Sequence, residues 1–250
     1  MFTGIISAIG KVDKKESVGG DIRLTIDAGN LNLSDVGLGD SIACNGACLT
    51  AVELTRTGFV ADVSIETINL TDIGQWRLGQ RINLEKAMQA TDRFGGHIVS
   101  GHVDGIGEVI SLEEDARSWR FRLRAPKDLA KYIAHKGSIT VDGTSLTVNK
   151  VEGSEFELNI VPHTMLHTVM GDYSVGTKIH LEVDIFNLAE LAEVLLDVGV
   201  LGLLGQGAAE QLTVIFVSLS HLSDLPKIAY SVKKTSLKAN QNNDIHPVVQ

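Results

Sequence analysis

The sequence predicts an all-β protein built from two tandem copies of one small sandwich or barrel. The segment SIACNGACLT (41–50) returns 97 residues later as SITVDGTSLT (138–147), and this offset aligns residues 2–85 without a gap, at about 20 identities. Each copy contains short runs in which apolar and polar residues alternate. Turn residues recur about every 8 to 12 positions, the spacing typical of a small β-sandwich or barrel.

The alternating runs predict matching strands in the two copies. FTGIISAIGKV (2–12) opens the first copy and aligns with VSGHVDGIGEV (99–109). Asn45-Gly46 and Asp142-Gly143 are tight-turn dipeptides at matching places. Residues 126–137 have helical spacing instead and predict a helical segment. The predicted strands cover residues 21–27, 41–46, 58–65 and 81–85, and then 118–124, 138–143, 155–161 and 178–184.

These patterns divide the chain into four parts. The first barrel covers residues 1–97, which include the connector that follows residue 86. The second barrel covers residues 98–185. Residues 186–204 predict an amphipathic helix that seeks a partner surface, such as another subunit, because Leu188, Leu191 and Leu195 recur at helical spacing. Asp197 and glycines interrupt it too often for a membrane span. Residues 205–250 form an atypical tail that we expect to be partly disordered.

Charge and cysteine content narrow the class of protein. A net charge of −9 argues against a general binder of nucleic acid or anionic membranes, because phosphate contacts need clustered Lys and Arg. The N-terminus has no basic region followed by a cleavage site, so no secretory signal is expected. Cys44 and Cys48 make no disulfide framework. We expect a reduced cytoplasmic protein.

Four segments, MFTGII, NGACLT, GGHIVSGHVDGIG and DGTSLTV, occur in this order in the duplicated chain. Together they resemble the riboflavin synthase α-chain family over about residues 1–185. The resemblance implies two six-stranded Greek-key barrels followed by a C-terminal helix, and three subunits joined mainly through that helix. The sequence after about residue 185, where the joining helix would lie, departs from the family pattern.

The resemblance also implies a reaction and its partners. Two molecules of 6,7-dimethyl-8-ribityllumazine would give riboflavin and 5-amino-6-(D-ribitylamino)uracil by transfer of a four-carbon unit. No metal or organic cofactor is implied. The active site would form between the first barrel of one subunit and the second barrel of its neighbour. A reaction between two copies of one molecule suits a chain that carries two copies of one pocket.

The two copies differ at polar positions, and proton-transferring groups gather in the second one. We expect Ser145 and His102 to assist addition and proton movement at one lumazine, with Asp142 orienting or tuning them. Lys136 would stabilise the anion that forms, and Cys48 would act on the other lumazine as a nucleophile or polar neighbour. The substitutions at offset 97 are Ile5 to His102, Gly39 to Lys136, Asn45 to Asp142, Cys48 to Ser145, and Glu66 to His163.

The family's binding segments, carried over by position, imply two sets of substrate-binding residues. Thr50 and Thr147 would hydrogen-bond the heterocycles. The first set is Gly4, Ile5, Ile6, Cys48, Leu49, Thr50, Asp62, Val63, Ser64, Ile65, Glu66 and Thr67. The second set is Gly101, His102, Val103, Lys136, Ser145, Leu146, Thr147, Asn159, Ile160, Val161, Pro162, His163 and Thr164.

Simpler interpretations stand beside these assignments. Ser145 could be an ordinary sheet residue, Cys48 a small buried apolar residue, and Asp142 only the first residue of a turn. Lys136 could be a charge that follows a helical segment. A metal site is not expected, since His97 and His102 are five residues apart and point to opposite faces of a regular strand.

Three rival functions remain open from the sequence. One is a non-catalytic lumazine- or flavin-binding protein of the same fold, which should have lost reactive groups in one barrel. A second is an interaction protein that docks through its apolar region near residues 187–220. The third is an enzyme impaired by its unusual C-terminal region.

Overall fold

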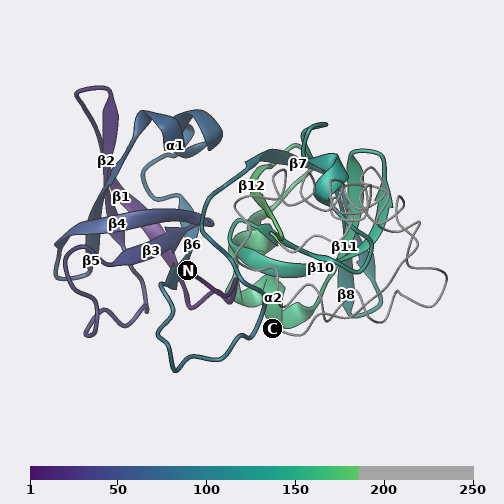
Figure 1. Ribbon diagram of the computed structural model, residues 1–250, viewed down its shortest axis with the longest axis horizontal. Coiled ribbons are helices and arrows are strands. Elements are labelled where there is room, and N and C mark those ends of the chain that lie inside the picture. The colour runs from purple at the N-terminus through teal and green to yellow at the C-terminus, as the bar shows by residue number, and fades with distance from the viewer. Residues whose placement is uncertain (186–250) are drawn as a thin grey trace, which may run out of the picture. The chain divides into compact units, whose positions relative to one another are not determined.

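The computed structural model describes residues 1–185, which contain two closed antiparallel barrels of six strands each (Figure 1). Both barrels belong to one compact unit. The predicted helix over 186–204 and the tail over 205–250 lie outside the described residues. The strands of the first barrel are β1 (Ala8–Val18), β2 (Asp21–Asp27), β3 (Ser41–Cys44), β4 (Ala47–Leu54), β5 (Gly58–Val63) and β6 (Arg81–Lys86).

The second barrel repeats the first at the predicted offset. Its strands are β7 (Gly105–Asp115), β8 (Ser118–Arg124), β9 (Ser138–Val141), β10 (Thr144–Glu152), β11 (Glu155–Ile160) and β12 (Lys178–Val183). One short helix follows the fifth strand of each barrel, α1 (Ile65–Leu70) and α2 (Pro162–His167). The 3-10 turns are η1 (Ile73–Gln75), η2 (Ala130–Tyr132) and η3 (Val169–Asp172). No helix within residues 1–185 is long and apolar enough to cross a membrane.

The strand order explains how each barrel closes. In the first barrel the order is β1-β2-β5-β4-β3-β6, and the corresponding strands of the second barrel follow the same order. The chain leaves β2 by a long connection, forms β3, β4 and β5 as consecutive neighbours, and returns with β5 beside β2, which is a Greek key. The expected fold of two six-stranded Greek-key barrels is confirmed.

Residues 126–137 are not the helical segment that their spacing predicts. Only the three residues of η2 are helical, and the rest of the segment is turn and loop. Leu129 and Ile133 are nevertheless buried against the core of the second barrel. The helical spacing therefore reflects a loop that packs on one side, and not a helix.

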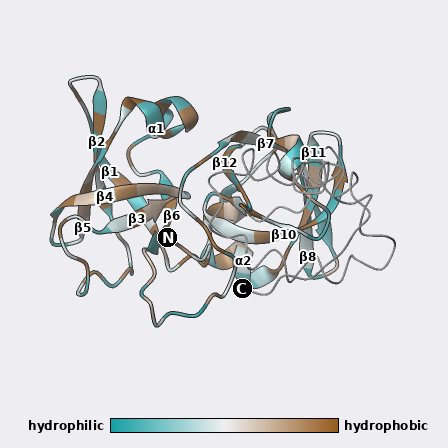
Figure 2. Ribbon diagram, viewed as in Figure 1, coloured by the Kyte–Doolittle hydropathy of each residue, from teal (hydrophilic) through white to brown (hydrophobic). Residues whose placement is uncertain are grey.

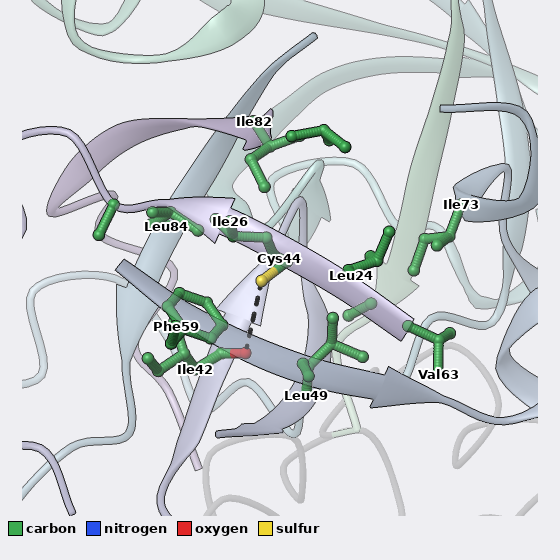
Figure 3. Packing of buried hydrophobic residues seen from close by; sticks show 14 of the residues in the cluster. Leu24, Ile26, Ile42, Cys44, Leu49, Phe59, Val63, Ile73, Ile82 and Leu84 are labelled. Atoms are coloured by element: carbon green, nitrogen blue, oxygen red, sulfur yellow. Dashed lines mark hydrogen bonds between the residues drawn. The ribbon is translucent and has the colours of Figure 1, made fainter. Parts of the chain in front are cut away.

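The barrel cores come from strict alternation along the strands. In β2, Ile22, Leu24 and Ile26 point inward while the residues between them are partly or fully exposed, so polar and apolar residues interleave along the ribbon (Figure 2). Figure 3 shows the first core, in which Leu24, Ile26 and Phe59 surround the thiol of Cys44. This thiol donates to the Ile42 carbonyl at 3.8 Å, and burial raises its pKa.

Cys44 and Cys48 are both free, although the chain reverses between them. Cys44 lies in the first core, whereas Cys48 is only partly buried on the neighbouring strand β4. The turn that separates them is the predicted Asn45-Gly46 turn, with φ values of 45° and 83°. Its equivalent, Asp142-Gly143, has φ values of 45° and 77°. Both predicted tight turns are confirmed, as positive φ at both central residues is typical of a two-residue hairpin.

Equivalent residues of the two copies meet at the junction between the barrels. The Phe2 N–H donates to the Val99 carbonyl at 2.8 Å, and the Val99 N–H donates back to Phe2 at 3.1 Å. Gly46 and Gly143 also face each other, so a Cβ on either one would lie 2.8 Å from the backbone nitrogen of the other. Residues 97 apart that bind each other indicate an approximate twofold relation between the barrels.

Candidate functional site

Two buried carboxylates fix the segments that lead into the barrels. Glu85 of β6 accepts hydrogen bonds from the Thr3 N–H and hydroxyl, both at 2.7 Å, and from the Gly4 N–H at 3.0 Å. Glu182 of β12 accepts the same three bonds from Ser100 and Gly101. Burial raises the pKa of both carboxyl groups, while the bonds they accept oppose the rise. Each segment is thus attached to its own barrel.

Each attached segment then crosses to the other barrel. The Gly4 carbonyl accepts from the Ser145 N–H at 2.8 Å, and the Gly101 carbonyl accepts from the Cys48 N–H at 2.8 Å. A Cβ on Gly4 would lie 2.6 Å from Cβ of Ser145, and one on Gly101 would lie 2.7 Å from Cβ of Cys48. Close approach therefore requires glycine at both positions.

The crossing at Gly101 creates a pocket that we call the Cys48 half-site. It is a cavity of about 190 Å³ between β4, α1 and the segment that follows Val99. His102 and Cys48 both line it, together with Thr67 of α1. The full lining is Ala47, Cys48, Glu66, Thr67, Leu70, Thr71, Gly101, His102 and Val103.

The crossing at Gly4 creates its counterpart, the Ser145 half-site, defined by Gly4, Gly96, His97 and Ser145. His97 Nδ1 lies 2.7 Å from the Ser145 hydroxyl oxygen, and the His97 N–H donates to the Thr3 carbonyl at 3.1 Å. Gly96 passes so close that a Cβ there would lie 2.7 Å from Ser145 Oγ. The connector therefore supplies an imidazole to the hydroxyl of β10.

His97 is the residue that the sequence analysis did not assign to the site. Burial lowers its pKa below the usual value, and the charge of Asp184 opposes this. A neutral imidazole can accept the serine proton, which is how a histidine activates a hydroxyl. His97 lies within the GGHIVSGH segment, but it belongs to the connector, so the comparison of the two copies gives it no partner.

The crossing segments bring together residues from the two predicted binding sets. Gly4 and Ile5 were expected in one set with Cys48, and Gly101 and His102 in the other with Ser145. In the structure Gly4 contacts Ser145, while Gly101 and His102 line the pocket of Cys48. Each segment thus binds the barrel that it does not belong to, and which residues contact which ligand stays a prediction.

The other predicted catalytic residues lie outside the two half-sites. Asp142 is buried at the junction, where it accepts from the His180 N–H at 2.8 Å and from the Tyr173 hydroxyl. Lys136 precedes β9, with its N–H bonded to Val148 and its Nζ 3.4 Å from the side-chain oxygen of Asn149. Their catalytic roles stay predictions.

The predicted binding residues divide by the face of the strand that they occupy. Leu49, Val63 and Ile160 have their side chains in the barrel cores. Thr50 and Thr147 are exposed, and Asp62 forms a bidentate ion pair with Arg23 at 2.7 and 2.8 Å. The remaining predicted binding residues are Ile6, Ser64, Ile65, Leu146, Asn159, Val161, Pro162, His163 and Thr164, which are at least partly exposed.

A larger cavity of about 710 Å³ lies beside the first barrel, between β3, β6 and the connector. Its lining includes Ile5, Asp35, Lys86 and Arg93, but none of the five predicted catalytic residues. Lys86 and Asp35 are bonded to each other at 2.6 Å across it. Cys48, His102 and Ser145 therefore lie in the two half-sites and not in this larger cavity.

His97 and His102 lie in different half-sites, His97 beside Ser145 and His102 in the cavity of Cys48. Within residues 1–185, no group of three or more His, Cys, Asp or Glu side chains is arranged to hold a metal ion.

Comparison with known proteins identifies the two copies of the repeat as two copies of one domain. The family model of the lumazine binding domain matches the chain twice, at residues 3–87 and 100–184. The riboflavin synthase of Photobacterium phosphoreum is 51% identical over 185 residues, which cover 74% of this chain and 85% of that protein. The chain belongs to the riboflavin synthase family. The riboflavin synthase of Bacillus subtilis is 41% identical over 184 residues, with the same coverage of 74% and 85%.

Solved structures agree with this family at the level of the fold. LumP complexed with riboflavin superimposes with a TM-score of 0.69 at 23% identity, covering 74% of this chain and 100% of that chain. LumP complexed with 6,7-dimethyl-8-(1'-D-ribityl) lumazine gives a TM-score of 0.67 at 23% identity. This chain and LumP thus share the arrangement of paired barrels described above.

Proposed function

We propose that this member of the riboflavin synthase family converts two molecules of 6,7-dimethyl-8-ribityllumazine into riboflavin and 5-amino-6-(D-ribitylamino)uracil. One lumazine gives a four-carbon unit to the other. The observation that carries the proposal is the pair of half-sites, which occupy equivalent places in two lumazine binding domains and hold different reactive groups. The two products contain every atom of the two reactants, so the reaction consumes no oxidant and no water.

Positioning is the main contribution that we assign to the fold. Holding two reactants in a productive geometry can lower the barrier by about 7–11 kcal/mol in favourable model systems. Two half-sites related by an approximate twofold would bind two copies of one reactant in related orientations. The glycines at the crossings let the backbone of each segment lie directly against Ser145 or Cys48, which fixes the segments that complete the half-sites.

The reactive groups differ between the half-sites, and so would their tasks. In the Ser145 half-site, neutral His97 at 2.7 Å from the hydroxyl can take the serine proton or return it. In the Cys48 half-site, the thiol and His102 line one cavity, where they can contact the second lumazine. Lys136 would stabilise developing negative charge on a bound heterocycle.

We further propose that the complete active site needs more than one chain, in a homotrimer. The cavity of the Cys48 half-site, about 190 Å³, is small beside the roughly 300–1,000 Å³ typical of pockets for small molecules, so a further surface would have to enclose the ligand. Sedimentation equilibrium tests this: three chains per particle are expected, and an active monomer would contradict it. The free thiols support a reducing compartment such as the cytoplasm.

The test of function is incubation of the purified protein with the lumazine alone, followed by absorbance and chromatography. Riboflavin and the ribitylamino-uracil should form in equal amounts without added metal or cofactor. Stoichiometric binding without conversion would instead identify a carrier of the LumP kind. No binding at all would favour an interaction protein.

Substitutions test the assignment of the half-sites. Ser145→Ala and His102→Ala should each lower turnover by about 100-fold or more, the usual size of an acid–base contribution, while lumazine still binds. Fluorescence titration of the lumazine separates binding from turnover. Full activity in both variants would refute the assignment.

A further inference from the structure

Two equivalent side chains tie each barrel to the hairpin of the other. In the first barrel, Asn83 of β6 donates its Nδ2–H to the Asp142 carbonyl at 2.8 Å, and its Oδ1 accepts from the Val169 N–H at 2.8 Å. The Asn83 N–H donates to the Asn45 side chain at 2.7 Å. One amide therefore fastens the β9–β10 hairpin and the start of η3 to the first barrel.

His180 occupies the equivalent position in β12 and makes the reciprocal contacts. Its N–H donates to the Asp142 carboxylate at 2.8 Å, as that of Asn83 does to Asn45. Its Nδ1 lies 2.9 Å from the Asn45 carbonyl, and its Nε2 lies 2.7 Å from the Asp72 carboxylate. Asp72 is the counterpart of Val169, so this copy of the clamp replaces a neutral pair with an ionisable one.

The contacts of His180 suit a charged ring. Nδ1 donates to the Asn45 carbonyl, and a protonated Nε2 donates to the Asp72 carboxylate at 2.7 Å. In the neutral ring, Nε2 instead accepts from the Asp72 N–H, which lies at 3.1 Å. The raised pKa of His180 favours the charged form. The His180 side chain is only 1% exposed. Water therefore does little to screen this ion pair.

Two aromatic residues bind the carboxylates that surround the ring of His180. Trp76 donates its indole N–H to the Asp72 carboxylate at 2.6 Å and stacks on the ring of His180 at 6.1 Å between centroids. The Tyr173 hydroxyl donates to the Asp142 carboxylate. Burial lowers the pKa of His180, but the bond to Asp72 and the charges of Asp142 and Asp72 outweigh it and raise the pKa above 6.5. Burial raises the pKa of Asp142 to about 6, against the effect of His180.

The clamp acts on the backbone of both half-sites. Asn45 and Asp142 are the first turn residues of the hairpins whose second strands carry Cys48 and Ser145. Each half-site is completed by a segment anchored in the other barrel, through Gly101 or Gly4. A shift of one barrel against the other would therefore open both half-sites together.

We propose that His180 is a positioning residue whose positive charge, held between Asn45 and Asp72, keeps the Cys48 and Ser145 half-sites in register across the junction. The inference rests on the proposed function, since the reaction needs both half-sites aligned. It goes beyond it by assigning the alignment to one ion pair that the other copy of the repeat lacks.

Two variants of His180 separate its hydrogen bonds from its charge. His180→Ala removes both, and we expect kcat to fall by about 10- to 100-fold, the cost of small misplacement, with a much smaller change in KM. His180→Asn installs the residue of the other copy, which can still donate to Asn45. Near pH 6, where His180 is charged in the wild type, we expect His180→Asn to recover only part of the kcat that His180→Ala loses, because the amide restores the hydrogen bond but not the charge.

The dependence on pH identifies the charge. Because the pKa of His180 is raised, its contribution is complete below about 6.5, the usual value, and is lost as the pH rises through the higher value of the folded state. The wild type should therefore lose kcat and thermal stability as the pH rises and His180 loses its proton. His180→Asn should not show this alkaline loss. Asn83→Ala is the matched control, because it breaks the neutral clamp and should still show the alkaline loss of kcat and thermal stability.

Several outcomes would overturn the inference. Wild-type kcat in folded His180→Ala would do so, as would equal losses of thermal stability in both variants with unchanged kcat and pH profile. If His180→Ala does not fold, the pH profile of His180→Asn alone decides. Wild type is assayed in parallel: if it forms no riboflavin, the proposed function fails, while the step in stability against pH still tests the charge of His180.

Discussion

Lys136 adopts a backbone conformation that the other copy of the repeat gives to glycine. Its φ is +66°, and that of the equivalent Gly39 is +93°. A side chain in this left-handed region costs about 1–2 kcal/mol relative to the right-handed one. Such strain is retained where the side chain has a task, and the predicted task of Lys136 is to stabilise negative charge.

Lys136→Gly should therefore separate stability from activity. We expect the free energy of unfolding to rise by about 1 kcal/mol or less, because glycine relieves the strain but loses more entropy on folding. We expect kcat to fall at least about tenfold with the loss of the charge. Urea unfolding and riboflavin formation measure the two effects. Lys136→Ala should lose activity without gaining stability, and an active Lys136→Gly would remove Lys136 from the mechanism.

The protonation of His97 should control activity and stability at low pH. Burial lowers its pKa, so the neutral ring that faces Ser145 should gain a proton only below about 6.5, the usual value. Both kcat and stability should then fall as the pH drops, because the unfolded chain binds the proton more tightly. His97→Asn should lower kcat by about 100-fold or more and abolish the acid limb. His135→Asn, at an exposed histidine, should leave that limb unchanged, and a limb that persists in His97→Asn would assign it elsewhere.

Among the elements, the two hairpin turns have the strictest requirements. Gly143 has φ +77° and faces the backbone of Gly46 at the distance of direct contact. Gly79 has nearly the same φ, +79°, but a Cβ there would meet nothing within 4 Å. The chain thus offers one glycine that serves both conformation and packing, and one that serves conformation alone.

Alanine substitutions at Gly79 and Gly143 should separate the cost of the backbone conformation from the cost of the close packing. Gly79→Ala should lower the free energy of unfolding by about 1–2 kcal/mol for the left-handed conformation alone. Gly143→Ala should cost about 1–3 kcal/mol more, because the methyl group forces two backbones apart. It should also lower kcat, since the junction carries both half-sites. Equal losses, measured by urea unfolding, would mean that the junction absorbs the methyl group freely.

Element by element, the sequence was most informative where one face of a strand meets a core. The strand β2 alternates without interruption, and its predicted range of 21–27 matches the structure. The first strand was not predicted as such, because DKKESV at its outer end extends beyond the core and is mostly exposed. The segment 126–137 misled because a loop packed on one side imitates the spacing of a helix. The exchange of segments between half-sites depends on tertiary contacts that no local pattern encodes.

For the molecule as a whole, the offset of 97 could be read from the sequence, but the approximate twofold could not. Phe2 and Val99 are equivalent positions that bond to each other, and only the assembled chain reveals this. The junction also joins the two barrels energetically, through Asn83 and His180. We therefore expect the barrels to unfold together.

The two tryptophans report on this cooperativity, because Trp76 belongs to the first copy and Trp119 to the second. In Trp119→Phe and in Trp76→Phe, the fluorescence of the remaining tryptophan should follow the same urea midpoint as the far-ultraviolet circular dichroism of that variant. Each variant is its own control for changes in stability. A fluorescence midpoint that departs from the dichroism would show that one barrel melts alone.

The closure of each barrel has a consequence for self-association. Every strand of the described chain has a neighbour on both sides, so neither sheet offers a row of free amides to a passing peptide. Fibrous polymers that grow by adding strands would first have to break the hydrogen bonds between two neighbouring strands of a barrel. Contacts between chains that use residues 1–185 must instead be made by side chains on the outer walls of the barrels.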